Sequence, residues 1–433
     1  MKPFYLIVAL IFYSQTLIAQ VIQHQEKLIE HIKDHNFRKI HRQFDENLSK
    51  NVSVLFLKKS LNALEKAIGS YQSHGKTEIV KSSKNIEYIT PLYFKKGCLI
   101  MGSSLNDDGR LSKFYLKKKS YTLPPYGQGL SYYKEDLTIE SGPYKLPGEI
   151  IYPIRASQKL PLFIFVHGSG PNDRYESDGL IKVFKDMYLG LVSQGIACMV
   201  YDKRTFVYHK QFDSLQYTLW DETVEDAINA FKLAKMKTEI DTNQIFIIGH
   251  SQGGYALPLI LKGCNGVKGG VSMAGCARPL DVLLEYQYKY LTALDGKVSM
   301  AEKLFLKKEQ KKIDFIRSDQ FQSSPPYLKA LNYWPSEFWK NIKSYQPVEE
   351  LKALDCPILF LQGDRDYQVT DEDLKLWKSA CLEKKEWSFI SYPKLNHRFI
   401  EGEGKPTPWE YLNGGNIPLY VSEDIVKWMM VLD

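Results

Sequence analysis

The pattern of apolar and polar positions divides the chain into two parts of different texture. Residues 24–120 begin with apolar side chains at helical spacing, as in Ile29-Glu-His-Ile32, and Gly69 and Gly75 then interrupt the chain. Short alternating runs follow, at 77–80, 86–90, 92–94, 99–101 and 113–116, with a turn at Asn106–Gly109 that closes a hairpin. Helices followed by antiparallel strands predict a small α+β domain over 24–120, with its sheet curved into a cone.

A connector rich in Pro and Gly, residues 121–129, places the domain boundary near residue 125. A hairpin from 137–139 to 149–152 then begins a second domain, residues 125–433. Continuous apolar runs alternate with helical patterns after it; the expected strands are 163–166, 197–201, 244–248, 270–274, 358–363 and 387–392, and the expected helices between them include 181–191 and 222–235. Such alternation predicts a parallel sheet with right-handed crossovers.

The strands expected at 270–274 and 358–363 are too far apart for an ordinary crossover. We therefore expect a helical lid, at approximately 277–350. It is rich in aromatic side chains, namely Tyr286, Tyr288, Tyr290, Phe305, Phe315, Tyr327, Tyr333, Trp334, Phe338 and Trp339. They could wall an acyl or aryl pocket, but more than half are expected simply to pack the lid onto the sheet.

The most informative motif is Gly249-His-Ser-Gln-Gly253, which directly follows the apolar strand and leads into a helical run. A strand, a sharp turn and a helix with one serine at the turn is the nucleophile-elbow pattern, in which the serine hydroxyl projects above a parallel sheet. Glycines on both sides suit the strained backbone and the close approach of strand and helix. Ser251 is thus a candidate nucleophile.

A serine hydroxyl needs a histidine base and a carboxylate, which follow it in the order Ser, Asp or Glu, His on this type of sheet. His397 is the one histidine after Ser251, and it follows the strand-like run 387–392. The acid is expected in Gly363-Asp-Arg-Asp366, at the end of another buried strand. We choose Asp366 over Asp364, because hydrolases of this fold usually carry the acid three residues beyond that glycine; Asp364 is expected to cap the loop.

A tetrahedral oxyanion needs preorganised backbone N–H donors. One is expected from Gln252, and the other from Gly168 or Ser169, in the glycine-rich loop after the strand that ends at Val166. The two other histidines near these motifs are given structural roles. His167 is expected to shape the glycine-rich loop, and His250 to pack into the fold.

Composition changes this picture little. A formal net charge of +7 over 433 residues, with basic and acidic residues interspersed, gives no reason to expect nucleic-acid binding. The 6 cysteines contain no Cys-x-x-Cys pair, so neither a structural zinc nor another metal is expected, and disulfide pairing stays open. Residues 1–19 read as a signal peptide, which predicts export to the periplasm or the extracellular space; no apolar run in the mature chain is long enough for a membrane span.

Taken together, His167-Gly-Ser-Gly170, Gly249-His-Ser-Gln-Gly253, Gly363-Asp-Arg-Asp366 and His397 make residues 125–433 resemble the α/β-hydrolase superfamily. Two further stretches, 167–174 and Tyr201-Asp-Lys-Arg204, resemble the EstD group of bacterial esterases. In that group an NTF2-like domain of the DUF3887 type precedes the hydrolase, and residues 34–117 resemble it through Phe37, Phe44, 69–71, Gly75 and 109–110. The loop 175–178 departs from the group, whose members tend to carry another acidic residue directly after position 174.

This resemblance implies a cofactor-independent serine carboxylesterase that acts on a small-molecule ester with Ser251, Asp366 and His397 as its triad. Two alternatives stay open. The same triad could cleave peptides or acyl-CoA thioesters, or the chain could be a binding protein with an idle hydrolase site. Neither the acyl and alcohol parts of the substrate nor the oligomeric state follows from the sequence.

Overall fold

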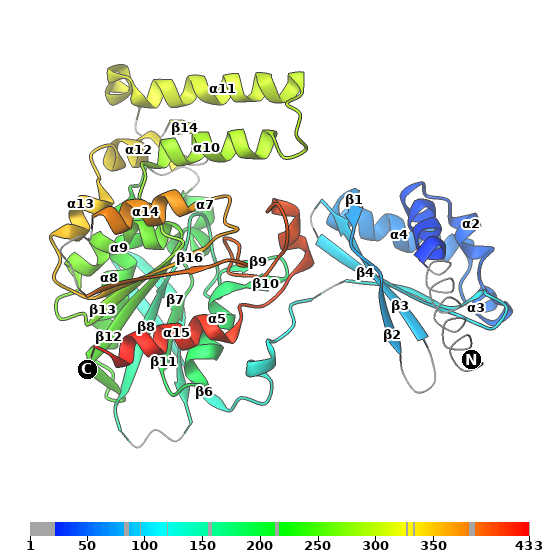
Figure 1. Ribbon diagram of the computed structural model, residues 1–433, viewed down its shortest axis with the longest axis horizontal. Coiled ribbons are helices and arrows are strands. Elements are labelled where there is room, and N and C mark those ends of the chain that lie inside the picture. Colours follow the sequence, from blue (N-terminus) through cyan, green and yellow to red (C-terminus); the bar gives the residue numbers. More distant parts are fainter. Residues whose placement is uncertain are drawn as a thin grey trace, which may run out of the picture. The chain divides into compact units, whose positions relative to one another are not determined.

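The computed structural model describes residues 22–432, except 82–85, 96, 119, 155–157, 213–215, 326–327, 332–333 and 381–385. The expected signal peptide, Cys381, Tyr327 and Tyr333 therefore lie outside the described residues. The chain divides into two compact units between Tyr121 and Thr122, so the second unit begins three residues before the start at 125 that the sequence predicts. The units are coloured blue to cyan and cyan to red in Figure 1.

The first unit packs helices against one curved antiparallel sheet. Its helices are 22–33, α2 (Phe37–His41), α3 (Glu46–Asn51) and α4 (Val54–Ile68), and its strands are β1 (Tyr71–His74), β2 (Glu78–Lys81), β3 (Ile86–Phe94), β4 (Gly97–Leu105) and β5 (Leu111–Lys118). The strand order is β1-β3-β4-β5, and β2 also pairs with β3. Local sequence fixes the limits of α4, because the Ser53 side chain accepts a hydrogen bond from the N–H of Phe56 and Gly69 ends the helix at a φ of 83°.

The second unit is built on an eight-stranded sheet in the order β17-β16-β13-β12-β8-β11-β7-β6. Its strands are β6 (Tyr132–Ser141), β7 (Tyr144–Pro153), β8 (Leu160–Val166), β11 (Ala197–Tyr201), β12 (Ile240–His250), β13 (Gly269–Met273), β16 (Ile358–Gly363) and β17 (Trp387–Tyr392). From β11 to β17 all neighbours are parallel, while the hairpin β6–β7 closes one edge antiparallel. This topology confirms the parallel α/β sheet predicted from the alternation of strand and helix patterns.

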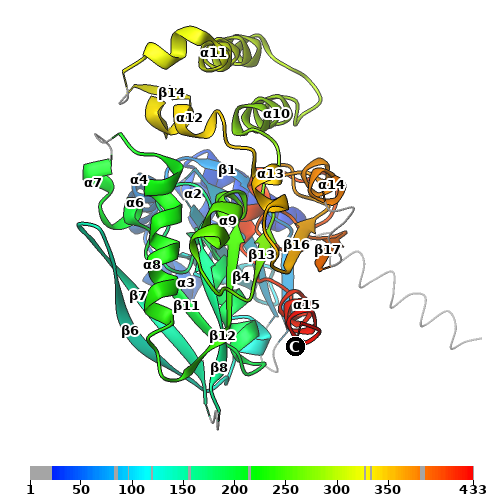
Figure 2. The same ribbon diagram turned by 90° about the vertical axis from the view of Figure 1, so that its left-hand side faces the viewer.

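Helices cover both faces of this sheet (Figures 1 and 2). In β8, Leu162, Ile164 and Val166 belong to one core cluster, and Phe163 and Phe165 belong to the other. The first cluster includes side chains of α8 (Glu225–Ala234), α9 (Gln252–Gly263) and α14 (Asp371–Ser379), and the second includes those of α5 (Val183–Val192) and α15 (Leu419–Met430). The continuous apolar runs therefore mark strands that are buried on both faces.

Short elements fill the connections. They are η1 (Pro125–Gly127), β9 (Ser177–Asp178), β10 (Ile181–Lys182), α6 (Arg204–Val207), α7 (His209–Phe212), the π-helical turn η2 (Trp220–Val224) and η4 (Pro408–Asn413). The helix expected at 222–235 is thus two elements, because a π-helical turn precedes α8. The helix expected at 181–191 begins later, since Ile181 and Lys182 pair with the short strand β9.

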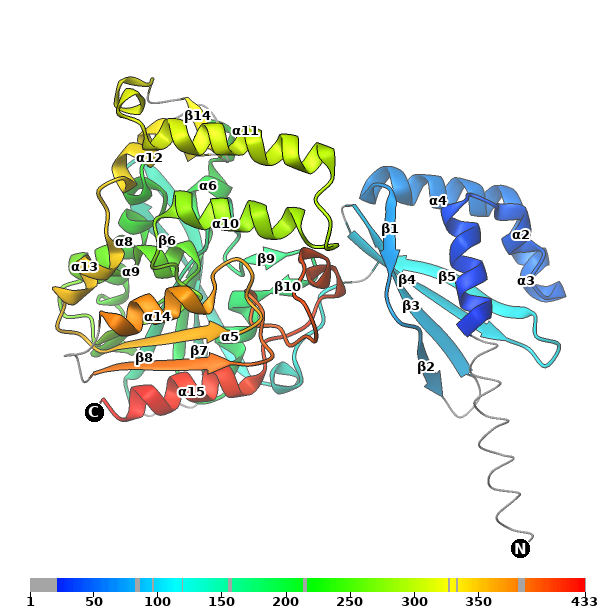
Figure 3. The ribbon, with the colours of Figure 1, turned by 45° about the horizontal axis from the view of Figure 1, so that its top comes forward.

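Residues 274–357, between β13 and β16, form a largely helical insertion that Figure 3 shows above the sheet. It contains α10 (Leu280–Thr292), α11 (Met300–Arg317), η3 (Asp319–Ser323), β14 (Lys329–Leu331), β15 (Trp334–Pro335), α12 (Ser336–Ile342) and α13 (Pro347–Lys352). Trp334, Phe338 and Trp339 are buried in the core, and the rings of Trp334 and Phe338 stack 4.8 Å apart. These three aromatic side chains are part of the core, whereas Phe305 and Phe315 of the same set are exposed. Tyr290 instead stacks on Tyr367 of the loop after β16, at 5.2 Å.

Cys98, Cys198, Cys264, Cys276 and Cys356 are free thiols. Within the part of the chain that the structure describes, no cluster of His, Cys, Asp and Glu side chains is suited to hold a metal ion. No helix among the same residues is both long and apolar enough to cross a bilayer.

Candidate active site

Every residue of the candidate site follows the carboxyl end of a parallel strand. Gly168 and Ser169 follow β8, Ser251 follows β12, Asp366 follows β16 and His397 follows β17. The order of the strands reverses beside β8, since the chain passes from it to β11 on one side and then to β12 on the other. This switch point is where open α/β sheets form their binding crevices.

Ser251 lies in a strained turn between β12 and α9. Its φ of 52° and ψ of −111° are unusual for a residue with a Cβ. Its N–H donates to the Met273 carbonyl of β13 at 2.9 Å, and its own carbonyl accepts from the N–H of Tyr255 in α9 at 2.9 Å, so β13 and α9 hold the turn. The strain thus falls on the serine itself.

The two flanking glycines are required for a different reason. A Cβ on Gly249 would lie 2.4 Å from the Gly253 carbonyl, and one on Gly253 would lie 2.3 Å from the Val166 carbonyl oxygen. Neither glycine has a positive φ. Close approach of strand and helix, and not an unusual backbone angle, therefore demands glycine at both positions.

The structure brings Ser251, His397 and Asp366 together. The Ser251 hydroxyl Oγ is 3.1 Å from His397 Nε2, and His397 Nδ1 is 2.6 Å from Asp366 Oδ2. Because an ionised carboxylate only accepts, Nδ1 carries the proton and Nε2 is free to accept the serine proton. Asp366 and His397 are buried, while Ser251 is partly exposed.

Backbone groups fix the carboxylate. Asp366 Oδ1 accepts from the N–H of Gln368 at 2.7 Å and from that of Val369 at 2.9 Å, which leaves Oδ2 directed at the imidazole. The expectation for Asp364 is wrong: its side chain is exposed and makes no hydrogen bond within the described residues, so it does not cap the loop. Of the two aspartates, only Asp366 contacts His397.

The expected backbone donors need one correction. The N–H of Gly168 donates to the buried carboxylate Oε1 of Glu176 at 2.7 Å and is therefore not available to an oxyanion. Among the described residues, the N–H groups of Ser169 and Gln252 have no acceptor. The glycine-rich loop is nonetheless next to the serine, since a Cβ on Gly168 would lie 3.2 Å from the Ser251 Cβ. Ser169 and Gln252 remain the candidate pair of donors.

Sequence reasoning missed Glu176, which is buried against His250. Their Oε2 and Nδ1 atoms are 2.9 Å apart, an ion-pair distance at which the geometry of a hydrogen bond is not met. His250 Nε2 lies 2.8 Å from the His397 carbonyl oxygen. His250 is thus buried in the fold as expected, but it also joins the glycine-rich loop to the histidine loop.

His167 has the expected structural place. It is buried, and its Nε2 lies 3.0 Å from the Asp173 carbonyl oxygen within the same loop. Burial lowers the pKa of His167 to about 4. It therefore holds the loop as a neutral side chain.

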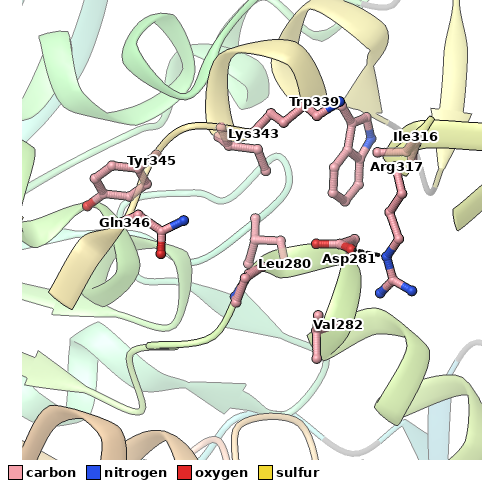
Figure 4. A pocket seen from close by; sticks show the side chains of 11 residues that line it. Leu280, Asp281, Val282, Ile316, Arg317, Trp339, Lys343, Tyr345 and Gln346 are labelled. Atoms are coloured by element: carbon pink, nitrogen blue, oxygen red, sulfur yellow. Dashed lines mark hydrogen bonds and ion pairs between the residues drawn. The ribbon is translucent and has the colours of Figure 1, made fainter. Parts of the chain in front are cut away.

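A cavity of about 250 Å³ lies within the insertion, and neither Ser251, Asp366 nor His397 lines it. Leu280, Ile316 and Trp339 form its apolar part, and Asp281 and Arg317 pair at its edge, as Figure 4 shows. Of the aromatic side chains expected to wall a pocket, Trp339 lines this cavity.

Comparison with known proteins finds a relative that matches nearly the whole chain. The chain is 32% identical over 406 residues to esterase EstD of Thermotoga maritima, an alignment that covers 93% of each protein. No protein-family model matches.

Similar solved structures include Est1E from Butyrivibrio proteoclasticus, with a TM-score of 0.44 and 15% identity over 69% of this chain and 98% of that one. An esterase of Pyrococcus furiosus gives a TM-score of 0.43 and 16% identity over 72% and 98%. Such overall similarity is too weak to say anything of activity. The sequence identity along almost the full length of esterase EstD is sufficient to show the family: the chain belongs to the EstD esterase family.

Proposed function

We propose that this protein is a serine carboxylesterase that hydrolyses small-molecule esters through an acyl-enzyme on Ser251. The observation that carries the proposal is the chain of contacts from Ser251 Oγ through His397 to Asp366, at 3.1 and 2.6 Å. Membership of an esterase family supports the choice of an ester as substrate. The proposal requires no cofactor.

In this mechanism His397 Nε2 takes the proton from Ser251 as Oγ attacks the ester carbonyl. The carbonyl oxygen becomes an oxyanion that accepts hydrogen bonds from the N–H groups of Ser169 and Gln252. His397 then gives the proton to the departing alcohol, and a water molecule, activated by the same nitrogen, releases the acid and restores the serine.

The environment of His397 suits a base that must be neutral before the reaction. Burial lowers the pKa of His397 from its ordinary value of 6.5, and the Asp366 carboxylate opposes this by favouring the imidazolium. The base is therefore unprotonated at neutral pH, and Asp366 stabilises the imidazolium when it forms.

Hydrolysis of p-nitrophenyl esters from acetate to laurate at neutral pH tests the proposal, with the Ser251→Ala variant beside the wild type. We expect kcat to fall by on the order of 10⁴-fold or more in Ser251→Ala. Ser388→Ala is a matched control, since it removes an exposed hydroxyl on β17, and it should leave kcat unchanged. Near-normal turnover by Ser251→Ala would overturn the proposal.

The same experiment addresses the other activities of a Ser-His-Asp site. A folded wild type that does not hydrolyse the ester series but cleaves aminoacyl amides or acyl-CoA would be a peptidase or a thioesterase. A folded protein that cleaves none of the three would be a binding protein with an idle site. The profile of kcat/KM against acyl length would also give the size of the acyl pocket.

We propose further that the chain is exported and that residues 24–120 form an NTF2-like domain. The first proposal is supported by the apolar segment within residues 1–19, which lies outside the described residues. The second is supported by helices packed on a curved antiparallel sheet. Cell fractionation, with the N-terminal residue of the mature protein determined by mass spectrometry, tests export; an intact Met1 on protein confined to the cytoplasm would contradict it.

A further inference from the structure

Two neighbouring cations, Lys203 and Arg204, are buried directly after β11, each with 2% of its surface exposed. Burying a charge is costly unless it is paired and fully hydrogen-bonded. Both side chains meet this condition, but with partners in different parts of the unit. Two partners of Lys203, Gly168 and Gln252, belong to the candidate active site.

The ammonium of Lys203 donates three hydrogen bonds. Its acceptors are the Gly168 carbonyl oxygen at 2.9 Å, Glu222 Oε1 at 2.9 Å and the Gln252 side-chain oxygen at 3.0 Å. All three N–H groups of the ammonium are thus used. Two of the acceptors belong to residues that adjoin or supply the proposed oxyanion donors.

The bond to Gly168 bears directly on Ser169. The Gly168 carbonyl and the Ser169 N–H belong to one planar peptide unit, in which a trans bond makes the C=O and the N–H point in opposite directions. A cation held at the oxygen therefore orients the N–H away from itself and polarises it as a donor.

The bond to Gln252 acts on the other donor. The Gln252 side chain is fixed at both ends, since its oxygen accepts from Lys203 and its nitrogen donates to Glu222 Oε2 at 3.2 Å. Fixing this side chain orients the first turn of α9, which begins at Gln252, where the backbone N–H has no acceptor within the helix.

Glu222 completes the network. It is fully buried, neutralises Lys203, and also accepts at Oε2 from the Trp334 indole N–H at 3.1 Å. Trp334 belongs to the insertion, so the network extends from the insertion to both oxyanion donors.

We propose that Lys203 is a positioning residue for the oxyanion hole: its buried ammonium orients the Gly168–Ser169 peptide and Gln252 so that their N–H groups converge on the developing oxyanion. This inference rests on the esterase function proposed above. Lys203 does not touch the substrate, and its effect is carried by the two backbone donors.

Arg204 offers a matched control within the same segment. Its guanidinium donates from Nε to both carboxylate oxygens of Asp226, at 3.0 and 2.9 Å, and from Nη2 to Ser141 and Glu225 at 2.8 and 2.7 Å. These partners lie on β6 and α8, away from the loops that carry the donors. Removing either cation breaks a buried ion pair, but of the two only Lys203 donates to Gly168 and Gln252 of the candidate site.

The test compares Lys203→Met with Arg204→Met in the full chain. For each we would measure kcat and KM on a p-nitrophenyl ester, the inhibition constant of a trifluoromethyl ketone, which forms a tetrahedral adduct on serine, and the melting temperature. Lys203→Met should lower kcat by about 10- to 100-fold with little change in KM, and should raise the inhibition constant of the ketone by a similar factor. Arg204→Met should lower the melting temperature yet keep kcat and the inhibition constant of the folded protein.

An unchanged kcat and inhibitor affinity in folded Lys203→Met, or equal losses in both variants, would overturn the inference. Should Lys203→Met not fold, Gln252→Met takes its place, because it removes one acceptor of Lys203 and keeps the backbone donor. A parallel loss of kcat and inhibitor affinity there supports the inference, and no loss overturns it. Failure of the esterase function itself is recognised separately, since the wild type would then hydrolyse no ester.

Discussion

Two buried histidine–carboxylate pairs lie side by side in the second unit, with the two imidazole rings 5.0 Å apart. In one, His397 Nδ1 lies 2.6 Å from Asp366; in the other, His250 Nδ1 lies 2.9 Å from Glu176. The pairs differ at the second ring nitrogen. Nε2 of His397 faces the Ser251 hydroxyl, and Nε2 of His250 faces the His397 carbonyl oxygen.

This difference distinguishes the proposed base, His397, from a structural histidine, His250. A carbonyl or carboxylate oxygen only accepts, so both nitrogens of His250 face acceptors and neither can take a proton from a serine. His397 has one acceptor and one hydroxyl, which is the arrangement of a general base. A buried histidine paired with a carboxylate is therefore not by itself evidence of catalysis. The group that faces its second ring nitrogen determines whether the histidine can act as a base.

The largest expected difference is between the two aspartates of the loop after β16. Asp366→Asn should lower kcat by about 10³- to 10⁴-fold, because the amide cannot hold the imidazole in the tautomer that accepts the serine proton. Asp364→Asn, the matched control two residues away, should change kcat by less than about twofold, because surface substitutions rarely matter. Steady-state kinetics on one ester measures kcat of both variants. Loss of activity in Asp364→Asn, with activity kept in Asp366→Asn, would assign the role of the acid to Asp364 instead.

Breaking the supporting pair should mainly cost stability. Burial alone would raise the pKa of Glu176, but His250, Arg398 and His167 together lower it to about 2. Replacing this buried anion by Glu176→Gln should reduce the free energy of unfolding by about 3 kcal/mol, because it leaves His250 without its partner. Denaturant titration measures the loss, and kcat of the folded variant should fall by about tenfold at most, since the triad keeps its own contacts.

The pH dependence of that stability has a definite sign. A folded pKa of about 2 is depressed below the ordinary value of 4.5, so the contribution of Glu176 is present above pH 4.5 and is lost as the pH falls toward 2. The wild type should lose stability over this window more steeply than Glu176→Gln. Equal slopes would mean that Glu176 is not held as an anion.

The smallest expected effect is on the pH profile of activity. Because burial lowers the pKa of His397 below 6.5, the acid limb of kcat/KM should have its midpoint below pH 6.5. Glu176→Gln should move this midpoint far less than it changes stability, since Glu176 does not contact His397. A midpoint above pH 6.5 in the wild type would contradict the environment described for His397.

The proximity of Ser251, Asp366 and His397 could be predicted from the sequence because each of the three follows a recognisable strand. The apolar runs before Ser251, Asp366 and His397 identify strands, and the parallel arrangement brings their carboxyl ends to one edge. The same logic identified the loop after β8. Local sequence thus predicts the strands, and the parallel topology of the sheet brings the residues that follow them together.

The supporting residues could not be found in this way. Glu176 and Lys203 lie in loops, and their partners are distant in sequence: Glu176 meets His250, while Lys203 meets Glu222 and Gln252. No short-range pattern specifies such pairs, because a buried, paired acidic or basic side chain cannot be told from a solvated one by the residues around it in the sequence. The expectation that Gly168 could be a donor is wrong for the same reason, since only the fold reveals that the Gly168 N–H donates to Glu176.

The role of Ser251 is tested most directly by covalent labelling of the full-length protein with a fluorophosphonate, which reacts with activated serines. We predict a single adduct, placed on Ser251 by peptide mass spectrometry, that forms in Glu176→Gln but is strongly slowed in Asp366→Asn. An adduct on another serine, or none on folded wild type, would contradict the account.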